Sequence, residues 1–235
     1  MTDSIWTRRR TAPPPREGLS ATQIVRTAIE VLDAEGLAGL SMRKLGSRLG
    51  AGATSLYWHV QTKDDLLELV IDEIFGEVDV PEPELAGWRP GAVLFAHSLR
   101  HTVLRHPWLP EVIYTRPSIG PNAVALGSRG LALFAAAGFT GLAIDYAMGS
   151  VMSYVFGRTN PEAVWRETMR RSGKTTEQWV DDVLADALPA SADSPEMQES
   201  IQRRRVDQDQ LQADAFMFGL DCLLDGLEAR LRTEA

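Results

Sequence analysis

Apolar residues recur every three to four positions along most of the chain, which is the spacing of one face of an α-helix. The first run follows Ser20, a residue type that caps helix N-termini, and continues through Ile24, Ala28 and Val31. Gly36 then ends the run, because glycine accepts the backbone conformation at which helices commonly stop. The pattern predicts a first helix between the serine and the glycine.

Three shorter helices are predicted next. Ser41 is a second N-cap, and the helix behind it, Met42 to Leu49, stops at Gly50. A third and very short helix covers about Thr54 to His59. Thr62 caps a fourth helix, whose first turn holds two aspartates that suit the positive end of the helix dipole.

No alternating strand pattern of useful length appears in the rest of the chain. Residues 1–18, with three consecutive prolines and four arginines, are predicted to form an extended and mobile basic arm. Residues 77–91 are acidic and proline-rich, which indicates a linker, and residues 189–206 are expected to be a loop or a loosely held helix. Further helices are predicted at about residues 91–106, 124–138, 141–158, 176–188 and 208–232.

Composition narrows the class of protein. With 235 residues, 44% of them hydrophobic, the chain can bury the core of one large or two modest domains. Its single cysteine, Cys222, excludes an internal disulfide, and a reducing cytoplasm is the expected compartment. No stretch reaches the roughly 18 uninterrupted apolar residues of a membrane span, and the N-terminus lacks the apolar run of a signal peptide. We therefore expect a cytoplasmic globular protein with no membrane partner.

The formal net charge of −8 hides an asymmetry between the two ends of the chain. Residues 1–63 hold nine Lys/Arg and five Asp/Glu, a net +4, whereas residues 64–235 hold fifteen and twenty-seven, a net −12. A basic end on an acidic body is typical of a nucleic-acid-binding protein. Ordinary scatter of charge is the alternative, because a binding surface needs the charges on one face.

The two short helices, Met42 to Leu49 and Thr54 to His59, have the spacing of a helix-turn-helix motif. The sequence LGAGA separates them. Gly46 lets the second helix approach the first closely, and Gly50 lies in the turn, where a positive φ is needed. A generic helical hairpin could share both features, but the N-caps around the motif and the very short second helix favour the DNA-binding form.

In such a motif the N-terminal end of the second helix faces the bases. Thr54 and Ser55 offer hydroxyls and helix-end amides at that end. Core packing is the alternative for the rings of Tyr57 and Trp58, and we expect one of these two rings to be half buried. A metal site at His59 is not expected, because no His, Cys or carboxylate lies three or four residues after it. The side chains expected at the DNA backbone are Tyr57, Trp58, His59 and Lys63.

The segment GLAGLSMRKLGSRLGAGATSLYWHVQTKDDLL resembles the N-terminal domain of TetR-family transcriptional repressors, and the similarity extends over residues 19–75. Members of this family bind operator DNA as homodimers and release it when a small ligand enters a C-terminal helical domain. The resemblance implies that Arg43 faces bases or backbone and that Thr54 and Ser55 begin the recognition helix. It also implies phosphate contacts for Tyr57, Trp58, His59 and Lys63.

The C-terminal part resembles tetracycline-repressor-like members of the family through RHPWL at Arg105 to Leu109, YTRP at Tyr114 to Pro117 and FMFGLDCLLDGLEARL near the end. Those members carry a histidine before TRP that ligates the magnesium of the drug complex, and this chain has Val112 there. Ala53 replaces a glutamine of their recognition helix, which removes a bidentate base reader. The resemblance therefore implies an inducer other than magnesium–tetracycline and a different operator.

Two helices are expected to form a dimer interface under two-fold symmetry. The helix at 141–158 is rich in small residues, which allow close approach, and the helix at 208–232 carries a wide apolar face. A palindromic operator would mirror that symmetry. The alternative is that both helices belong to the core of a monomer.

A ligand pocket is expected among the C-terminal helices, which in this family surround a cavity. Aromatic walls with a few polar groups would suit an aromatic or amphipathic effector, and ordinary core packing is the alternative for each residue. Two histidines have the i, i+4 spacing of metal ligands, but no acidic third ligand is evident, so neither a metal nor a cofactor is expected. The predicted pocket residues are His97, His101, Trp108, Tyr114, Phe134, Tyr146, Met152 and Tyr154.

Two other classes of protein compete with this interpretation. An enzyme would need a reactive motif, and the chain has no GXSXG, no P-loop and no GXGXXG after a strand. A helical interaction module with a vestigial helix-turn-helix would share the fold without binding DNA. The sequence predicts an all-α, non-enzymatic, ligand-responsive repressor. It consists of a disordered basic arm at 1–18, a three-helix helix-turn-helix domain at 19–76, and a larger ligand-binding and dimerisation domain at 88–235.

Overall fold

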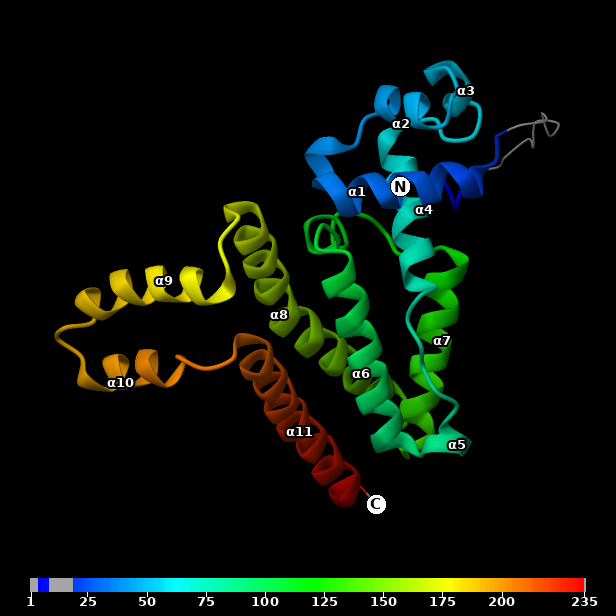
Figure 1. The fold of residues 1–235 in the computed structure, drawn as a ribbon. Coiled ribbons are helices and arrows are strands. Elements are labelled where there is room, and N and C mark those ends of the chain that lie inside the picture. The colour runs from blue at the N-terminus through cyan, green and yellow to red at the C-terminus, as the bar shows by residue number, and fades with distance from the viewer. Residues whose placement is uncertain (1–3, 9–18, 235) are drawn as a thin grey trace. The chain divides into compact units, whose positions relative to one another are not determined.

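The computed structural model describes residues 4–8 and 19–234, and the side chains of Ala53, Thr54, Ala86 and Glu234 lie outside the description. Within the described ranges every regular element is a helix (Figure 1), so the predicted all-α class is confirmed. The chain divides into two compact units, Met1–Phe156 and Gly157–Ala235, and helix α8 (Leu142–Ser172) contributes to both.

Helix α1 (Ala21–Gly39) begins at the predicted cap. Ser20 Oγ accepts the N–H of Gln23 at 3.1 Å, and Gln23 Oε1 accepts the N–H of Ser20 at 2.9 Å, which makes a capping box. Gly36 interrupts the helix with a φ of +68°, a left-handed value that glycine adopts without steric cost. The predicted end of the first helix is confirmed, and the residues behind it form a short separate turn.

Helices α2 (Met42–Arg48), α3 (Ala53–Tyr57) and α4 (Lys63–Phe75) follow in the predicted order. The hydroxyls of Ser41 and Thr62 each accept a backbone N–H from the first turn of the helix behind them, as the sequence predicts. Helix α3 ends two residues earlier than predicted, and a turn leads from it into α4. Helix α2 packs on α3, and α1 packs on α4.

Residues 77–91 do not form an open linker. Helix α5 (Pro83–Ala86) lies within them, and α6 (Trp88–Arg105) begins before they end. Both valines between α4 and α5 are buried, and α5 contacts α6 and α7 (Pro121–Ala136). The linker prediction is therefore wrong, because the burial of apolar side chains outweighs the acidic and proline-rich composition of this segment.

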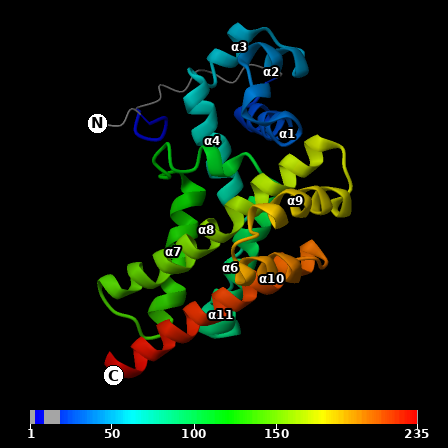
Figure 2. The ribbon, with the colours of Figure 1, turned by 90° about the vertical axis from the view of Figure 1, so that its left-hand side faces the viewer.

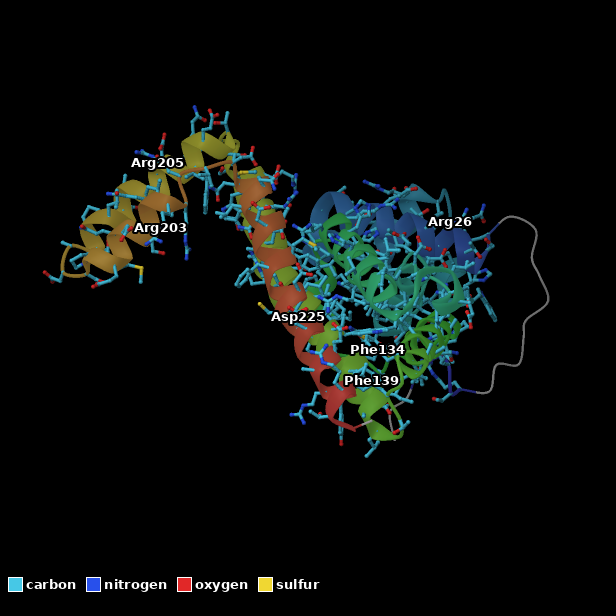
Figure 3. All side chains as sticks on the ribbon, turned by 90° about the horizontal axis from the view of Figure 1, so that it is seen from below. Arg26, Phe134, Phe139, Arg203, Arg205 and Asp225 are labelled. Atoms are coloured by element: carbon cyan, nitrogen blue, oxygen red, sulfur yellow. The ribbon has the colours of Figure 1, made fainter. Side chains whose placement is uncertain are left out.

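Helices α6 and α7 provide much of the core of the first unit, Met1–Phe156. A short 3-10 turn, η1 (Leu109–Glu111), leads from α6 toward the loop before α7. Phe95 and Leu99 of α6 are fully buried, as is Phe134 of α7. The ring of Phe134 meets that of Phe139 edge-on with 6.4 Å between centroids (Figure 3). Helix α7 also packs directly against α4.

Residues 4–8 form a turn that packs on α4, which corrects part of the predicted mobile arm; residues 9–18 lie outside the described residues. Ser4 Oγ donates to Glu68 Oε2 at 2.5 Å, and the N–H of Ile5 donates to the same oxygen at 3.1 Å. Arg8 pairs with the buried Asp65. Buried carboxylates need hydrogen-bond donors, and this turn supplies them.

In the second unit, α8 continues well beyond its predicted end at residue 158. It runs through Pro161, a residue type that usually ends or kinks a helix because it lacks an N–H. Glu162 and Ala163, which follow the proline, are both buried. Arg166 pairs with Glu162 one turn later at 3.0 Å, so packing and an ion pair stabilise the helix past its proline.

Helices α9 (Thr176–Ala190), α10 (Pro195–Arg203) and α11 (Gln208–Glu234) complete this unit. Helices α9 and α10 lie side by side (Figure 2). Helix α10 occupies the stretch for which the sequence left a loop or a loosely held helix open. Trp165 of α8 and Trp179 of α9 meet edge-to-face, with 5.6 Å between ring centroids.

Candidate nucleic-acid interface

Helix α3 directs its aliphatic residues inward and its aromatic residues outward. Leu56, within the helix, and Val60, just beyond it, are fully buried. Tyr57 is 48% exposed and Trp58 is 60% exposed. Core packing therefore does not account for either aromatic ring, although the sequence left that reading open. His59 is partly buried, and Ser55 is exposed at the start of the helix.

The turn before α3 has the backbone geometry that its glycines predict. Gly50 has a φ of +61° with open space around it, and Gly46 is buried. The N–H of Ala51 donates to the carbonyl of Gly46 at 2.9 Å, which closes the turn. Gly52 then caps α3 without a side-chain hydrogen bond. The predicted side-chain role of Thr54 lies outside the described residues, although its backbone is part of α3.

The basic residues of α2 divide into two groups. Lys44 and Arg48 both pair with Glu35 of α1, the arginine at 3.3 Å. The hydrogen bond from Lys44 holds the pKa of the Glu35 carboxyl below its ordinary value, helped by the charges of both cations. Arg43 is exposed on the same helix. Arg43 is thus the α2 cation that remains best suited to meet an anionic partner.

Lys63 has a structural contact that the sequence did not reveal. Its ammonium donates to the carbonyl of Leu40 at 3.0 Å and lies 3.4 Å from the carbonyl of Leu37, at the junction of α1 and α2. The side chain is nevertheless exposed. Because an ammonium has three donors, Lys63 can hold this junction and still offer a hydrogen bond to a phosphate.

Buried polar contacts join the first helices to the segment after α6. His106 is only 1% exposed; its Nδ1 lies 2.8 Å from Asp33 Oδ1 of α1, and its Nε2 lies 3.1 Å from Glu77 Oε2 beyond α4. The indole N–H of Trp108 donates to the same Asp33 oxygen at 2.7 Å. The sequence pointed to RHPWL only as a similarity, because partners 73 and 29 residues away leave no local signal.

A second set of contacts joins α4 to α7. The buried Asp72 accepts the N–H of Ala123 at 2.9 Å and that of Asn122 at 3.3 Å, both in the first turn of α7. Arg116, in the loop before α7, pairs with Asp64 in the first turn of α4. The sequence predicted only that Asp64 suits the positive end of the helix dipole, and it predicted no role for Asp72.

The structure places the predicted pocket residues in different surroundings. Trp108 and Phe134 are buried in the core, whereas Tyr114 is 70% and Tyr146 67% exposed. The ring of Tyr114 lies edge-on to that of Phe156 with 5.7 Å between centroids, and partial desolvation by the surrounding protein raises the pKa of its hydroxyl. His97 and His101 are exposed, and Met152 and Tyr154 are partly buried. Their common role in ligand binding stays a prediction.

A groove in the second unit was not predicted. It has a volume of about 580 Å³ and lies among α8, α9 and α11, with Trp165, Trp179 and Arg158 in its lining. Arg158 donates to Gln212 at 2.6 Å on one side of it. The tryptophans lie on separate helices, so only the folded chain brings them together.

Two other features are absent from the described part of the chain. No cluster of three or more His, Cys, Asp or Glu side chains there could hold a metal ion. No helix in the same part is both long and apolar enough to cross a lipid bilayer.

Comparison with known proteins agrees with this geometry. Residues 24–70 match the family model described as bacterial regulatory proteins, tetR family, and residues 80–231 match the tetracyclin repressor-like C-terminal domain. An HTH-type transcriptional regulator of Saccharopolyspora erythraea is 44% identical over 69% of this chain and 69% of its own length. The HTH-type transcriptional repressor DrrR1 of Streptomyces coeruleorubidus is 34% identical over 95% of this chain and 83% of its own length.

A similar solved structure is that of the Streptomyces coelicolor TetR family protein ActR in complex with actinorhodin. It is 30% identical, has a TM-score of 0.73, and covers 91% of this chain and 98% of its own. The matched models and relatives are transcriptional regulators, not enzymes. The helix-turn-helix of α2 and α3 and the helical C-terminal part are thus the two domains of such a regulator, and the chain belongs to the TetR family of transcriptional regulators.

Proposed function

We propose that this protein is a cytoplasmic, homodimeric repressor that binds a palindromic operator and releases it when a small aromatic or amphipathic effector binds. The observation that carries DNA binding is the outer surface of α3. Two large rings remain exposed there although the neighbouring aliphatic residues are fully buried. Exposed aromatic side chains beside exposed cations favour a phosphate-backbone partner over a folded core.

The proposed contacts follow from the order of residues along α2, α3 and α4. The start of α3, with Thr54 and Ser55, enters the major groove. Arg43 contacts bases or backbone from α2. The remaining contacts are to phosphates, from Tyr57, Trp58, His59 and Lys63.

Dimerisation is proposed through α8 and α11. Both helices carry large exposed apolar side chains, namely Leu142 and Tyr146 on α8 and Phe218 on α11, which are 67%, 67% and 74% exposed. Exposed apolar side chains on long helices are typical of a surface that another chain covers. A two-fold dimer would present two α3 helices to successive half-sites.

Release of DNA is proposed to act through α4. The two α3 helices can fit successive major grooves only near ~34 Å apart, so a small shift of α4 would weaken both half-sites together. Asp72 supports this route, because it binds α4 to the first turn of α7 in the C-terminal part. A small-molecule effector is also supported by ActR, which was solved with actinorhodin. The proposed effector contacts are the eight pocket residues predicted above.

The test is a titration of the purified protein against DNA from around its own coding region, across salt concentrations and with random duplex as competitor. A protected palindrome with a steep salt slope is expected. Arg43→Ala should weaken operator binding about tenfold and reduce the salt slope by about one. Trp58→Ala should also weaken binding, because it removes a ring that is 60% exposed on this surface.

Lys174→Ala is the matched control, since it removes an exposed cation whose ion pair with Asp182 lies in the other unit. Lys63→Ala is expected to weaken binding and to lower stability, because the ammonium also holds the α1–α2 junction. A helical interaction module is the alternative function. If Arg43→Ala and Trp58→Ala leave DNA retention unchanged, that alternative is favoured and the repressor is rejected.

A further inference from the structure

The C-terminal end of α6 lies near α1 (Figure 1). A buried histidine directly follows α6 and contacts α1 there. His106 is the C-cap of α6, with its N–H donating to the Thr102 carbonyl at 3.1 Å. Both of its ring nitrogens face carboxylates, Asp33 at 2.8 Å and Glu77 at 3.1 Å.

The two carboxylates favour the charged form of the ring. A neutral imidazole has one N–H, so one of its nitrogens would turn a lone pair toward a carboxylate oxygen about 3 Å away. The imidazolium donates to both. Burial disfavours the charge, but the hydrogen bonds and charges of Asp33 and Glu77 outweigh burial and raise the pKa of His106.

The surrounding groups complete a compact cluster. Arg105 lies 3.4 Å from Glu77, and the indole of Trp108 donates to Asp33. These are the charged and polar groups seen around the ring from α1, from the segment after α4, and from the end of α6. Two carboxylates thus face two cations, so the cluster is electrically balanced only while His106 carries its proton.

The two carboxylates lie on either side of the helix-turn-helix in the sequence. Asp33 belongs to α1, three residues before the Gly36 break, and Glu77 follows the end of α4. Helices α2 and α3 lie between Asp33 and Glu77 in the sequence. Helix α2 packs on both α1 and α3. Asp33 and Glu77 thus flank the part of the chain that contains α2 and α3.

We propose that His106, as an imidazolium, is a positioning residue for operator binding. It fixes the end of α6 to both α1 and the end of α4, and so holds α3 in its DNA-binding orientation. Loss of the proton or movement of α6 releases one carboxylate and loosens that orientation. This inference rests on the proposed repressor function.

The test compares operator affinity of the wild type with that of His106→Gln between pH 6 and pH 9. Glutamine keeps a polar side chain but cannot become a cation. At the lowest pH the wild type should bind about tenfold more tightly, and the ratio should fall toward one as pH rises through the pKa of His106. Any other titrating group is present in both proteins and cancels in the ratio.

A second variant separates charge from packing. Glu77→Gln keeps the size of the side chain and removes one of the two carboxylates, so the pKa of His106 should fall and the pH profile should move to lower pH. Lys174→Gln should leave the profile unchanged, because its charge belongs to an exposed pair in the other unit. A constant affinity ratio across the whole pH range would show that His106 only fills space, and would overturn the proposal.

An operator-independent readout distinguishes failure of this inference from failure of the repressor function. In ¹⁵N-histidine spectra of the DNA-free protein, both ring nitrogens of His106 should be protonated at pH 6, with the signal assigned by its loss in His106→Gln. Hydrogen exchange in α1 and at the end of α4 should be faster in that variant than in the wild type. A neutral tautomer, or unchanged exchange, rejects the proposal whether or not an operator is found.

Discussion

Three acidic residues on α4 show how much a single side chain depends on partners far away in sequence. Asp65, Glu68 and Asp72 are all buried, with 2%, 8% and 5% of their surface exposed. Each receives hydrogen bonds from outside its helix: Arg8 reaches the first, the turn at Ser4 reaches the second, and α7 reaches the third. A buried carboxylate without such donors would strongly destabilise the fold, so these contacts are part of its stability.

Substitution of Ser4 by alanine tests this at the residue scale. The change removes the 2.5 Å hydrogen bond to Glu68 and leaves the carboxylate with the N–H of Ile5. We expect the free energy of unfolding to fall by about 1–3 kcal/mol, the cost of an underbonded buried polar group. Urea denaturation of the wild type and of Ser4→Ala measures this difference in the free energy of unfolding. Ser118→Ala, at an exposed loop position, should change stability by no more than about 0.5 kcal/mol, and an equal loss in both variants would contradict this account.

At the scale of the element, α7 depends on α4 for its N-terminal cap. Gly120 and Pro121 stand at its start and offer no capping side chain, so Asp72 of α4 accepts the first free N–H groups instead. The fit is tight, because a Cβ on Gly120 would lie 2.3 Å from Asp72 Oδ1. The Asp72 side chain therefore caps α7 and at the same time links α7 to α4, the helix that follows the helix-turn-helix.

Asp72→Ala should remove this cap and lower the free energy of unfolding by about 1–2 kcal/mol, the usual effect of losing a helix cap. Asp72→Asn should have a smaller effect, since the amide oxygen can still accept one N–H. Hydrogen exchange of the Asn122 and Ala123 amides gives the local readout. Unchanged protection of these amides in Asp72→Ala would show that the cap is dispensable.

At the scale of the whole molecule, the DNA-facing helices and the segments after them form one compact unit. The polar contacts of His106, Asp72 and Arg116 therefore lie inside a packed region and not across a flexible hinge. The basic charge of residues 1–63 is partly used internally: Lys44 and Arg48 pair with Glu35, and Arg8 pairs with Asp65. Net charge thus overstates the positive charge that this end exposes, and Arg43 and Lys63 are among the cations that stay exposed.

Stability of the whole molecule should depend on pH through His106. Its folded-state pKa is raised above the ordinary value of 6.5 by Asp33 and Glu77, against the opposing effect of burial. The folded state therefore holds the proton more tightly, so the contribution is fully present below pH 6.5 and is lost as pH rises through the folded-state pKa. The difference in unfolding free energy between wild type and His106→Gln, followed by tryptophan fluorescence, should shrink with rising pH. A difference that grows with pH would contradict the assignment.

The sequence by itself determined the all-α class, the caps of α1, α2 and α4, the turn glycines and the helix-turn-helix, because capping, glycine conformation and helical periodicity are local properties. Only the tertiary structure decided which polar residues become buried partners. Asp72 and His106 look like ordinary surface residues in sequence, and their partners lie tens of residues away. The packed segment at 77–91 and the long α8 through Pro161 were likewise decided by burial against other helices, which outweighs local composition.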